Sequence, residues 1–177
     1  MKKILVSAAL AAILGTAAFS ASAVDGTITF NGKVNSNTCT INAGTGASFA
    51  VTLPTVGAGS LGTTAGTVAG TTPFNIALSA CSATGTVKAY FEPGATINTN
   101  GRLSNTATTG AAAGVDLQVL NSGQTAINLN TQSGTTTATI ASNAATLNYF
   151  VQYYNTTAAA VTPGTVSSTV NYTIQYQ

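Results

Sequence analysis

Apolar and polar residues alternate along much of this chain, and the alternation predicts β-strands. Beyond residue 23, apolar side chains recur at every second position in short segments that Gly, Pro or Asn residues interrupt. The alternating positions are Phe49, Val51 and Leu53; Phe74, Ile76 and Leu78; Val87, Ala89 and Phe91; Val115, Leu117 and Val119; Ile127 and Leu129; Leu147, Tyr149, Val151 and Tyr153; and Val166, Val170, Tyr172, Ile174 and Tyr176. Short strands at this spacing predict an all-β sandwich.

Three connecting stretches, 57–72, 99–114 and 131–145, are rich in Gly, Thr and Ala and lack aromatic residues. We expect loops or weak edge strands there, because such sequences offer little apolar surface to bury. The chain length is that of one domain.

The first 23 residues have the organisation of a signal peptide. A short basic start (1–3) precedes an apolar segment (4–14) and a small-x-small cleavage site at 21–23. A membrane anchor is the alternative, but the apolar stretch is barely long enough to span a bilayer, and polar residues and glycine weaken its second half. We therefore expect an exported protein whose mature chain starts at Val24 and has 154 residues (177 minus 23).

The few charges exclude several classes of function. After cleavage, three cations balance three anions: Lys33, Lys88 and Arg102 against Asp25, Glu92 and Asp116. A neutral chain lacks the basic surface that binds nucleic acid or anionic membranes. The chain has no His, its carboxylates are far apart in the sequence, and no nucleophile, phosphate-binding or metal-ligand motif is present. We expect no enzyme activity, no cofactor and no metal, and we interpret the charges as solvated surface groups.

Two cysteines, Cys39 and Cys81, remain in the exported chain. Export places them in an oxidising compartment, which predicts one disulfide. It would close a loop of about 40 residues and stabilise the fold by roughly 4 kcal/mol in the simplest chain-entropy model.

The segments 24–34 and 165–177 are both alternating and both lie at an end of the mature chain. An ordinary first strand is one interpretation of 24–34. However, the segment precedes Cys39, outside the disulfide-closed region, and Gly32 interrupts its apolar face as glycine does where another backbone approaches closely. The segment 165–177 ends on a strand whose other side something must cover. Together they indicate a subunit that assembles by lending strands to its neighbours.

Four segments and the spacing at the C-terminus carry a family resemblance. They are GTITFNGKV (26–34), NTCTI (37–41), VTLPTV (51–56) and PFNIALSAC (73–81), followed by Gly164 as the fourteenth residue from the end and Tyr176 as the penultimate residue. In this order and at these spacings they resemble the chaperone–usher pilins, specifically type 1-like fimbrial subunits.

The resemblance implies an incomplete immunoglobulin-like sandwich that lacks its last strand and is completed by donor-strand exchange. Residues 24–34 would be the donor extension and 35–177 the pilin domain, after the signal peptide 1–23. The donor residues would be Gly26, Ile28, Phe30, Gly32 and Val34. The groove strand and the chaperone-recognition residues would be Gly164, Val170, Tyr172, Ile174, Tyr176 and Gln177.

The resemblance also implies the function and the partners. We expect a structural subunit that is exported through the periplasm to a fimbrium on the cell surface and supports cell adhesion. Its partners would be a periplasmic chaperone, an outer-membrane usher and neighbouring pilin copies in a homopolymer, with no nucleic acid and no metal. A minor adaptor pilin is one alternative. A secreted carbohydrate-binding β-sandwich is another, although such modules commonly bind sugars through Trp or Tyr and this chain has no Trp.

Overall fold

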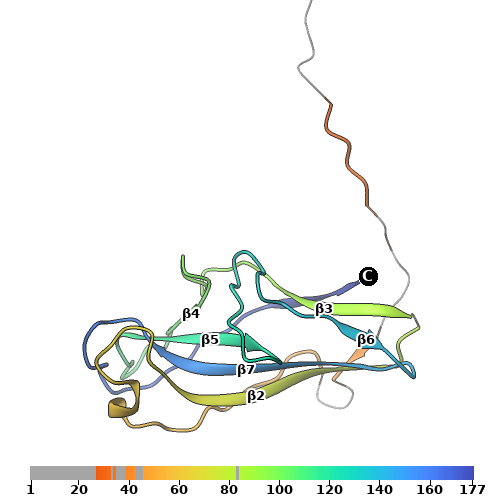
Figure 1. Cartoon of the computed structure of the whole chain (residues 1–177). Helices are drawn as coiled ribbons and strands as arrows, with labels where there is room; N and C mark the ends of the chain where they lie inside the picture. Colours follow the sequence, from red (N-terminus) through yellow and green to blue (C-terminus); the bar gives the residue numbers. More distant parts are fainter. Residues whose placement is uncertain (1–26, 33, 35–38, 43–45, 83) are drawn as a thin grey trace, which may run out of the picture. The chain divides into compact units, whose positions relative to one another are not determined.

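The computed structural model describes residues 27–32, 34, 39–42, 46–82 and 84–177 (Figure 1). The chain divides into two units, 1–35 and 36–177. In the first unit, the described residues 27–32 and 34 form no strand. The strand predicted over 24–34 is therefore not observed within them, and the predicted signal peptide 1–23 lies outside the described residues. Among the residues described, no helix has the length and apolar character needed to cross a membrane.

The second unit consists of two antiparallel sheets. The five-stranded sheet has the order β1-β2-β7-β5-β4 and the three-stranded sheet the order β6-β3-β8. The strands are β1 (Thr40–Ile41), β2 (Val68–Ser79), β3 (Gly85–Phe91), β4 (Leu103–Ser104), β5 (Val115–Asn121), β6 (Ala138–Ile140), β7 (Ala145–Asn155) and β8 (Tyr172–Tyr176), and one short 3-10 helix, η1 (Ala58–Leu61), precedes β2. Figure 1 shows β3 and β6 in one layer and β2, β7 and β5 in the other.

The core lies between the two sheets, and the alternation along the strands builds it. In the long pair of β2 with β7, Ile76 lies opposite Leu147 and Phe74 opposite Tyr149, and these side chains point into the core. Asn75 and Asn148, one position further along each strand, are exposed. Burial of each large apolar side chain contributes about 1.5–3 kcal/mol before ordering costs. The period of two in the sequence therefore reflects one buried and one exposed face.

The structure confirms the all-β prediction and four of the predicted strands, which are parts of β2, β3, β5 and β7. The predicted loops 99–114 and 131–145 contain β4 and β6, and both are edge strands as expected. The loop prediction for 57–72 is wrong at its end, because β2 already begins at Val68. Val68 pairs there with Tyr154, and an irregularity in register follows between Ala69 and Thr72.

Three strand predictions are wrong in whole or in part. Residues 49–53 form no strand, and Ile127 and Leu129 are buried in a turn-rich segment outside any named strand. The final strand begins only at Tyr172, since 166–171 has no strand assignment. In each case the apolar positions face the core or its opening, but the backbone lacks a continuous ladder with another described strand.

The predicted disulfide between Cys39 and Cys81 is present, with the two Cα atoms 4.1 Å apart. Cys39 directly precedes β1, and Cys81 follows β2 closely. Because Thr40 lies opposite Ser79, the bond extends the pairing of these two neighbouring strands. The described residues contain no free cysteine.

Candidate functional site: a groove beside the last strand

The last strand, β8, has one paired edge and one open edge. It lies at the end of the three-stranded sheet and pairs with β3 alone. The N–H of Glu92 donates to the carbonyl of Asn171, and Gln177 exchanges two backbone hydrogen bonds with Thr86. Since successive residues of a strand direct their backbone groups to opposite edges, those of Tyr172, Ile174 and Tyr176 point away from β3. No strand in the described part of the chain lies beyond them.

The same arrangement continues upstream of β8. The carbonyl of Ser167 accepts a hydrogen bond from the N–H of Thr106 at 2.7 Å, and the carbonyl of Thr169 accepts one from the hydroxyl of Thr96 at 2.6 Å. Both partners lie on the side of the paired edge. The backbone groups of the alternate positions 166, 168 and 170 therefore point toward the open edge. The open edge thus extends from residue 166 to residue 176.

An apolar groove of about 760 Å³ runs beside this edge. Its two walls are the segments 47–51 with Leu53 and 166–172, and core side chains such as Ile76, Leu117 and Val151 form its floor. The ring of Phe49, in the first wall, reaches toward the second. Its centroid lies 6.4 Å from that of the Phe74 ring and 6.5 Å from that of the Tyr172 ring. A mostly apolar opening next to unpaired backbone groups is suited to one additional β-strand.

Two tyrosines of β8 make hydrogen bonds to other segments, one to the opposite wall of the groove and one to the residue that precedes β1. The hydroxyl of Tyr172 donates to the carbonyl of Ala47 at 2.7 Å, and the hydroxyl of Tyr176 accepts from the N–H of Cys39 at 3.0 Å. Burial raises the pKa of Tyr172 above its ordinary value of 10.0, so its phenol stays protonated and able to donate further into the alkaline range. These side chains hold Cys39 and Ala47 near β8, although neither residue pairs with the backbone of β8.

The structure brings some of the predicted groove residues together and places others elsewhere. Val170 and Tyr172 line the groove, and Ile174 and Tyr176 are partly buried against the core. The backbone N–H and carbonyl of Gln177 are hydrogen-bonded to Thr86 at the paired edge. Gly164 does not line the groove. It packs against residues 110–112 so closely that a Cβ atom would lie 2.5 Å from the N atom of Ala112.

The predicted donor residues that the structure describes are fully accessible. Ile28, Phe30 and Val34 are 78%, 88% and 101% exposed, and no atom lies within 4 Å of the position where a Cβ of Gly32 would be. Gly26 lies outside the described residues. Three large apolar side chains at alternate positions of one short segment thus face solvent in a single copy of the chain.

The sequence reasoning missed the wall formed by 47–51 and the groove positions Val166 and Ser168. The alternation at 49–53 coincides with this wall, but alternation by itself predicts a strand there. No sequence pattern distinguishes an apolar wall of an open groove from a strand with a partner.

The interpretation of Asp116 as a solvated surface charge is wrong. Its carboxylate accepts hydrogen bonds from Arg102 Nε at 3.0 Å and Asn98 Nδ2 at 2.7 Å, and the two charged side chains are only 12% and 15% exposed. The Arg102 guanidinium also lies 4.0 Å from the centre of the Tyr154 ring. This cluster links β5 and β7 to the approach to β4, on the face of the five-stranded sheet that points away from the groove.

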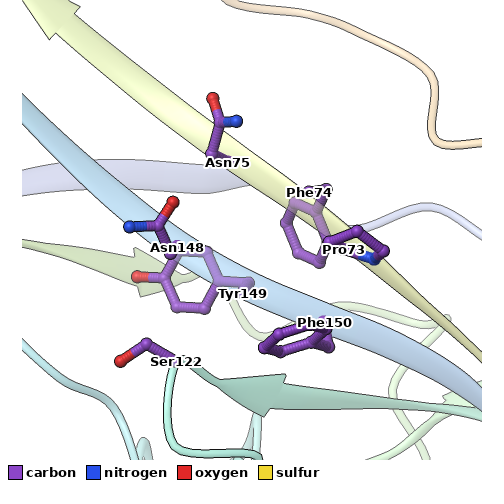
Figure 2. Close-up of a pocket in the computed structure, with 7 residues that line it drawn as sticks. All are labelled: Pro73, Phe74, Asn75, Ser122, Asn148, Tyr149 and Phe150. Atoms are coloured by element: carbon purple, nitrogen blue, oxygen red, sulfur yellow. The ribbon is translucent and has the colours of Figure 1, made fainter.

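A second hollow, of about 430 Å³, lies over β2 and β7 (Figure 2). Pro73 and Asn75 of β2, Asn148 and Phe150 of β7, and Ser122 line it. Its lining includes neither a carboxylate nor a basic side chain, and no group of three His, Cys, Asp or Glu residues that could hold a metal occurs in the described part of the chain. Phe74 and Tyr149 complete the lining, and the phenol of Tyr149 is its one ionisable group.

Known proteins similar to this chain are fimbrial subunits. The family profile described as "Type-1 fimbrial protein, A" (FimA) matches residues 53–177. The major fimbrial subunit SMF-1 of Stenotrophomonas maltophilia is 48% identical over 172 residues, covering 93% of this chain and 99% of that protein. The F17 fimbrial protein of Escherichia coli is 47% identical over 176 residues, covering 93% of this chain and 95% of that protein.

Solved pilus structures share the fold. A subunit of a chaperone–usher pilus superposes with a TM-score of 0.62 at 24% identity, over 87% of this chain and 96% of that one. The P pilus rod subunit PapA gives 0.60 at 22% identity, over 78% and 99%. At these identities the likeness shows the fold alone. A type I fimbria protein of Burkholderia pseudomallei gives 0.53 at 30% identity, over 78% and 88%.

Proposed function

Because the chain belongs to the type-1 fimbrial protein family and is a structural subunit of surface fimbriae rather than an enzyme, we propose that its copies join by strand donation. Segment 24–34 of one copy occupies the groove beside β8 of the next. The neighbour's strand then adds to the open edge of the three-stranded sheet. The subunits polymerise with neighbouring pilins, and this contact is the link that repeats along the filament.

The observation that carries the proposal is the open edge of β8 beside an apolar groove. Strand addition to such an edge gives affinity through main-chain hydrogen bonds and specificity through side chains at alternate positions. The open positions run from 166 to 176, which is eleven residues and matches the length of 24–34. An edge of this length without a partner would otherwise promote aggregation.

The exposed face of the proposed donor supports the same assignment. Burial in the groove would contribute about 1.5–3 kcal/mol of binding free energy for each of Ile28, Phe30 and Val34, before the cost of ordering the segment. Thr27, Thr29 and Asn31 alternate with them and remain on the solvent side of the added strand. The domain boundaries follow from this assignment: a signal peptide over 1–23, the donor extension 24–34 and the pilin domain 35–177.

We also propose that a periplasmic chaperone covers the groove first. At an outer-membrane usher, the donor segment of a neighbouring subunit then replaces the chaperone. The chaperone's strand would meet Tyr172, Ile174 and Tyr176 at the open edge, and its basic residues would bind the carboxylate of Gln177. The support is the family resemblance together with the open edge. Adding a few residues after Gln177 should then lower periplasmic accumulation and chaperone co-purification, while unchanged levels would reject this role.

A shaft subunit fits the comparisons better than an adaptor does, since the relative with 48% identity is a major fimbrial subunit and the minor fimbrial subunit HifD of Haemophilus influenzae has 34% identity. A monomeric carbohydrate-binding module has no comparable support.

The proposal is tested in cells that make the full precursor together with its export machinery. Deletion of 24–34 should abolish surface filaments in electron micrographs and the ladder of detergent-resistant polymers on gels. Gly32→Leu should do the same, because a side chain is added where the donor has none. The matched control is Thr29→Leu, which adds a similar side chain to the solvent face and should leave filaments intact. Normal filaments from the deletion variant would reject strand donation by this segment.

A further inference from the structure

Ser168 places a hydroxyl without a partner in a row of large side chains that faces the groove. Val166, Val170 and Tyr172 occupy the neighbouring positions of the same face and pack against the core. Ser167 and Thr169, on the opposite face, are exposed. The Ser168 Oγ atom is buried, and within the described part of the chain it has no hydrogen-bond partner.

We propose that the Ser168 hydroxyl donates a hydrogen bond to the backbone of the incoming strand at Gly32 of a second copy, and that this contact fixes the register of the added strand. The inference rests on the strand donation proposed above. It assigns to Ser168 a role in specificity, and it pairs the unpartnered hydroxyl of this row with the only position of the donor's described apolar face that lacks a side chain.

The physical reason is the cost of desolvation. The Ser168 hydroxyl is already out of contact with water in the separate subunit, and a buried hydroxyl without a partner is unfavourable, so a partner that the added strand brings is a gain. Ile28, Phe30 or Val34 above Ser168 would cover the hydroxyl with hydrocarbon. Gly32 leaves its own backbone within reach instead. A backbone carbonyl has two lone pairs, so it can accept from Ser168 while it also pairs with the edge of β8.

This pairing distinguishes the correct register from its nearest competitor. A slip of one residue turns the apolar face of the donor toward solvent and is strongly disfavoured. A slip of two residues keeps the apolar face inward, so apolar patterning alone discriminates against it weakly. With Gly32 at Ser168, Phe30 and Val34 reach Val166 and Val170 whichever way the strand runs. After the slip, a large side chain lies over the hydroxyl. Gly32 then lies opposite an apolar position of the groove, where it has no side chain to bury.

The test compares the effect of Ser168→Ala in filaments and in the separate subunit. In filaments the variant loses a hydrogen bond, so heat or detergent should dissociate them roughly two- to twelve-fold faster. In the separate full-length subunit the hydroxyl has no partner to lose, and the unfolding midpoint should stay the same or rise. Ser167→Ala, the matched control on the exposed face, should change neither. A loss in the separate subunit as large as that in filaments would overturn the proposal.

A double-mutant cycle tests the partner. Gly32→Ala should accelerate filament dissociation, because its methyl group separates the hydroxyl from the donor backbone. In the Ser168→Ala background this effect should be clearly smaller, since the hydrogen bond is already absent. The combination of Thr29→Ala with Ser168→Ala should be additive. Additive effects for Gly32→Ala as well would exclude a direct contact of Gly32 with Ser168.

The failure of this inference can be told from the failure of strand donation. If filaments depend on 24–34 but are indifferent to Ser168→Ala, the register contact is wrong and strand donation stands. If filaments of normal stability form without 24–34, strand donation fails and the register contact fails with it.

Discussion

Tyr176 accepts a hydrogen bond from the backbone N–H of Cys39 at 3.0 Å. This bond ties the last strand to the disulfide of Cys39 with Cys81, although Tyr176 belongs to the three-stranded sheet and Cys39 precedes β1 of the five-stranded sheet. Tyr172 makes a second tie, to the carbonyl of Ala47. Side chains thus hold the two walls of the groove together while the backbone edge of β8 stays open for a strand from outside.

We predict that removing either hydroxyl weakens the groove. Tyr176→Phe and Tyr172→Phe should each lower the free energy of unfolding by about 0.5–1.5 kcal/mol, because one hydrogen bond is lost and the ring remains. Urea unfolding of the purified chain measures the change. Tyr90→Phe is the matched control, since no hydrogen bond of its hydroxyl is present in the described structure, and it should be neutral. Equal losses in all three variants would mean that the hydroxyl bonds across the groove are irrelevant.

The disulfide should contribute substantially to a domain that lacks a strand. Replacement of both Cys39 and Cys81 by Ser should lower the free energy of unfolding by about 2–5 kcal/mol. Alkylation of the denatured, non-reduced protein should find no free thiol, as the described residues contain none. The sequence separation of 42 residues means that the bond restrains a large part of the unfolded chain. An unchanged unfolding midpoint in the double variant would contradict this account.

The sequence predicted best those strands that are buried on one face and paired on both edges. In β2 and β7, Ile76, Leu78 and Leu147 are almost fully buried while Asn75 and Asn148 are exposed, so the period of two is complete. Alternation reports which side of an extended segment meets the core. It does not report whether the backbone has a partner, and for this reason 49–53 and 166–171 were predicted as strands although the described structure assigns none there.

The groove itself was predictable in kind but not in detail. The alternation of Val170, Tyr172 and Ile174 indicated the open face, whereas the wall at 47–51 depends on tertiary contacts such as that of Phe49 with Phe74. Buried polar groups also depend on tertiary contacts, so the sequence pattern does not identify them. Asp116 looks like any surface carboxylate until folding brings Arg102 and Asn98 to it.

Asn155 should be the polar residue most costly to remove. It is fully buried, and its Nδ2 donates to the carbonyls of Leu61 at 3.0 Å and Ala159 at 3.1 Å, while its Oδ1 accepts from the N–H of Thr157 at 2.8 Å. Asn155→Ala removes the side-chain partner of the Leu61 carbonyl and of the Thr157 N–H, while the Ala159 carbonyl keeps the hydroxyl of Thr157, and the free energy of unfolding should fall by about 3 kcal/mol.

The control for this prediction is Asn148→Ala, at an exposed position of the same strand, where the change should stay within about 0.5 kcal/mol. Urea unfolding of both variants gives the comparison. A similar small effect at both positions would show that water replaces the lost partners of Asn155.

The cluster around Asp116 should stabilise the outer face of the five-stranded sheet. Asp116→Asn leaves the Arg102 guanidinium without its anion, and we expect a loss of about 1–3 kcal/mol, since the pair is partly screened by solvent. The double replacement of Arg102 by Met and Asp116 by Leu should recover part of this loss, because no charge is left unpaired. Lys88→Gln is the control and should have little effect. A larger loss in the double variant than in Asp116→Asn would contradict the prediction.

Alkaline pH should destabilise the fold through its buried tyrosines. Burial raises the pKa of both Tyr149 and Tyr172 above the ordinary 10.0. The folded state therefore binds the phenol proton more tightly than the unfolded state does. The stability is fully present below pH 10.0 and is lost as the pH rises through the raised pKa values. Thermal unfolding followed from about pH 8 to about pH 12 should show a falling midpoint in the upper part of this range.

Tyr149→Phe tests which group causes the alkaline loss. The variant keeps the ring that packs 5.4 Å from Phe74 and 5.5 Å from Phe91, measured between ring centroids, and it removes the phenol that must ionise. Its midpoint should match that of the unmodified chain at neutral pH and fall less at high pH. Tyr90→Phe should leave the alkaline slope as it was. An identical slope in Tyr149→Phe would mean that the ionisation of other groups unfolds the sandwich, and that the buried phenol between the two sheets is not the alkaline trigger.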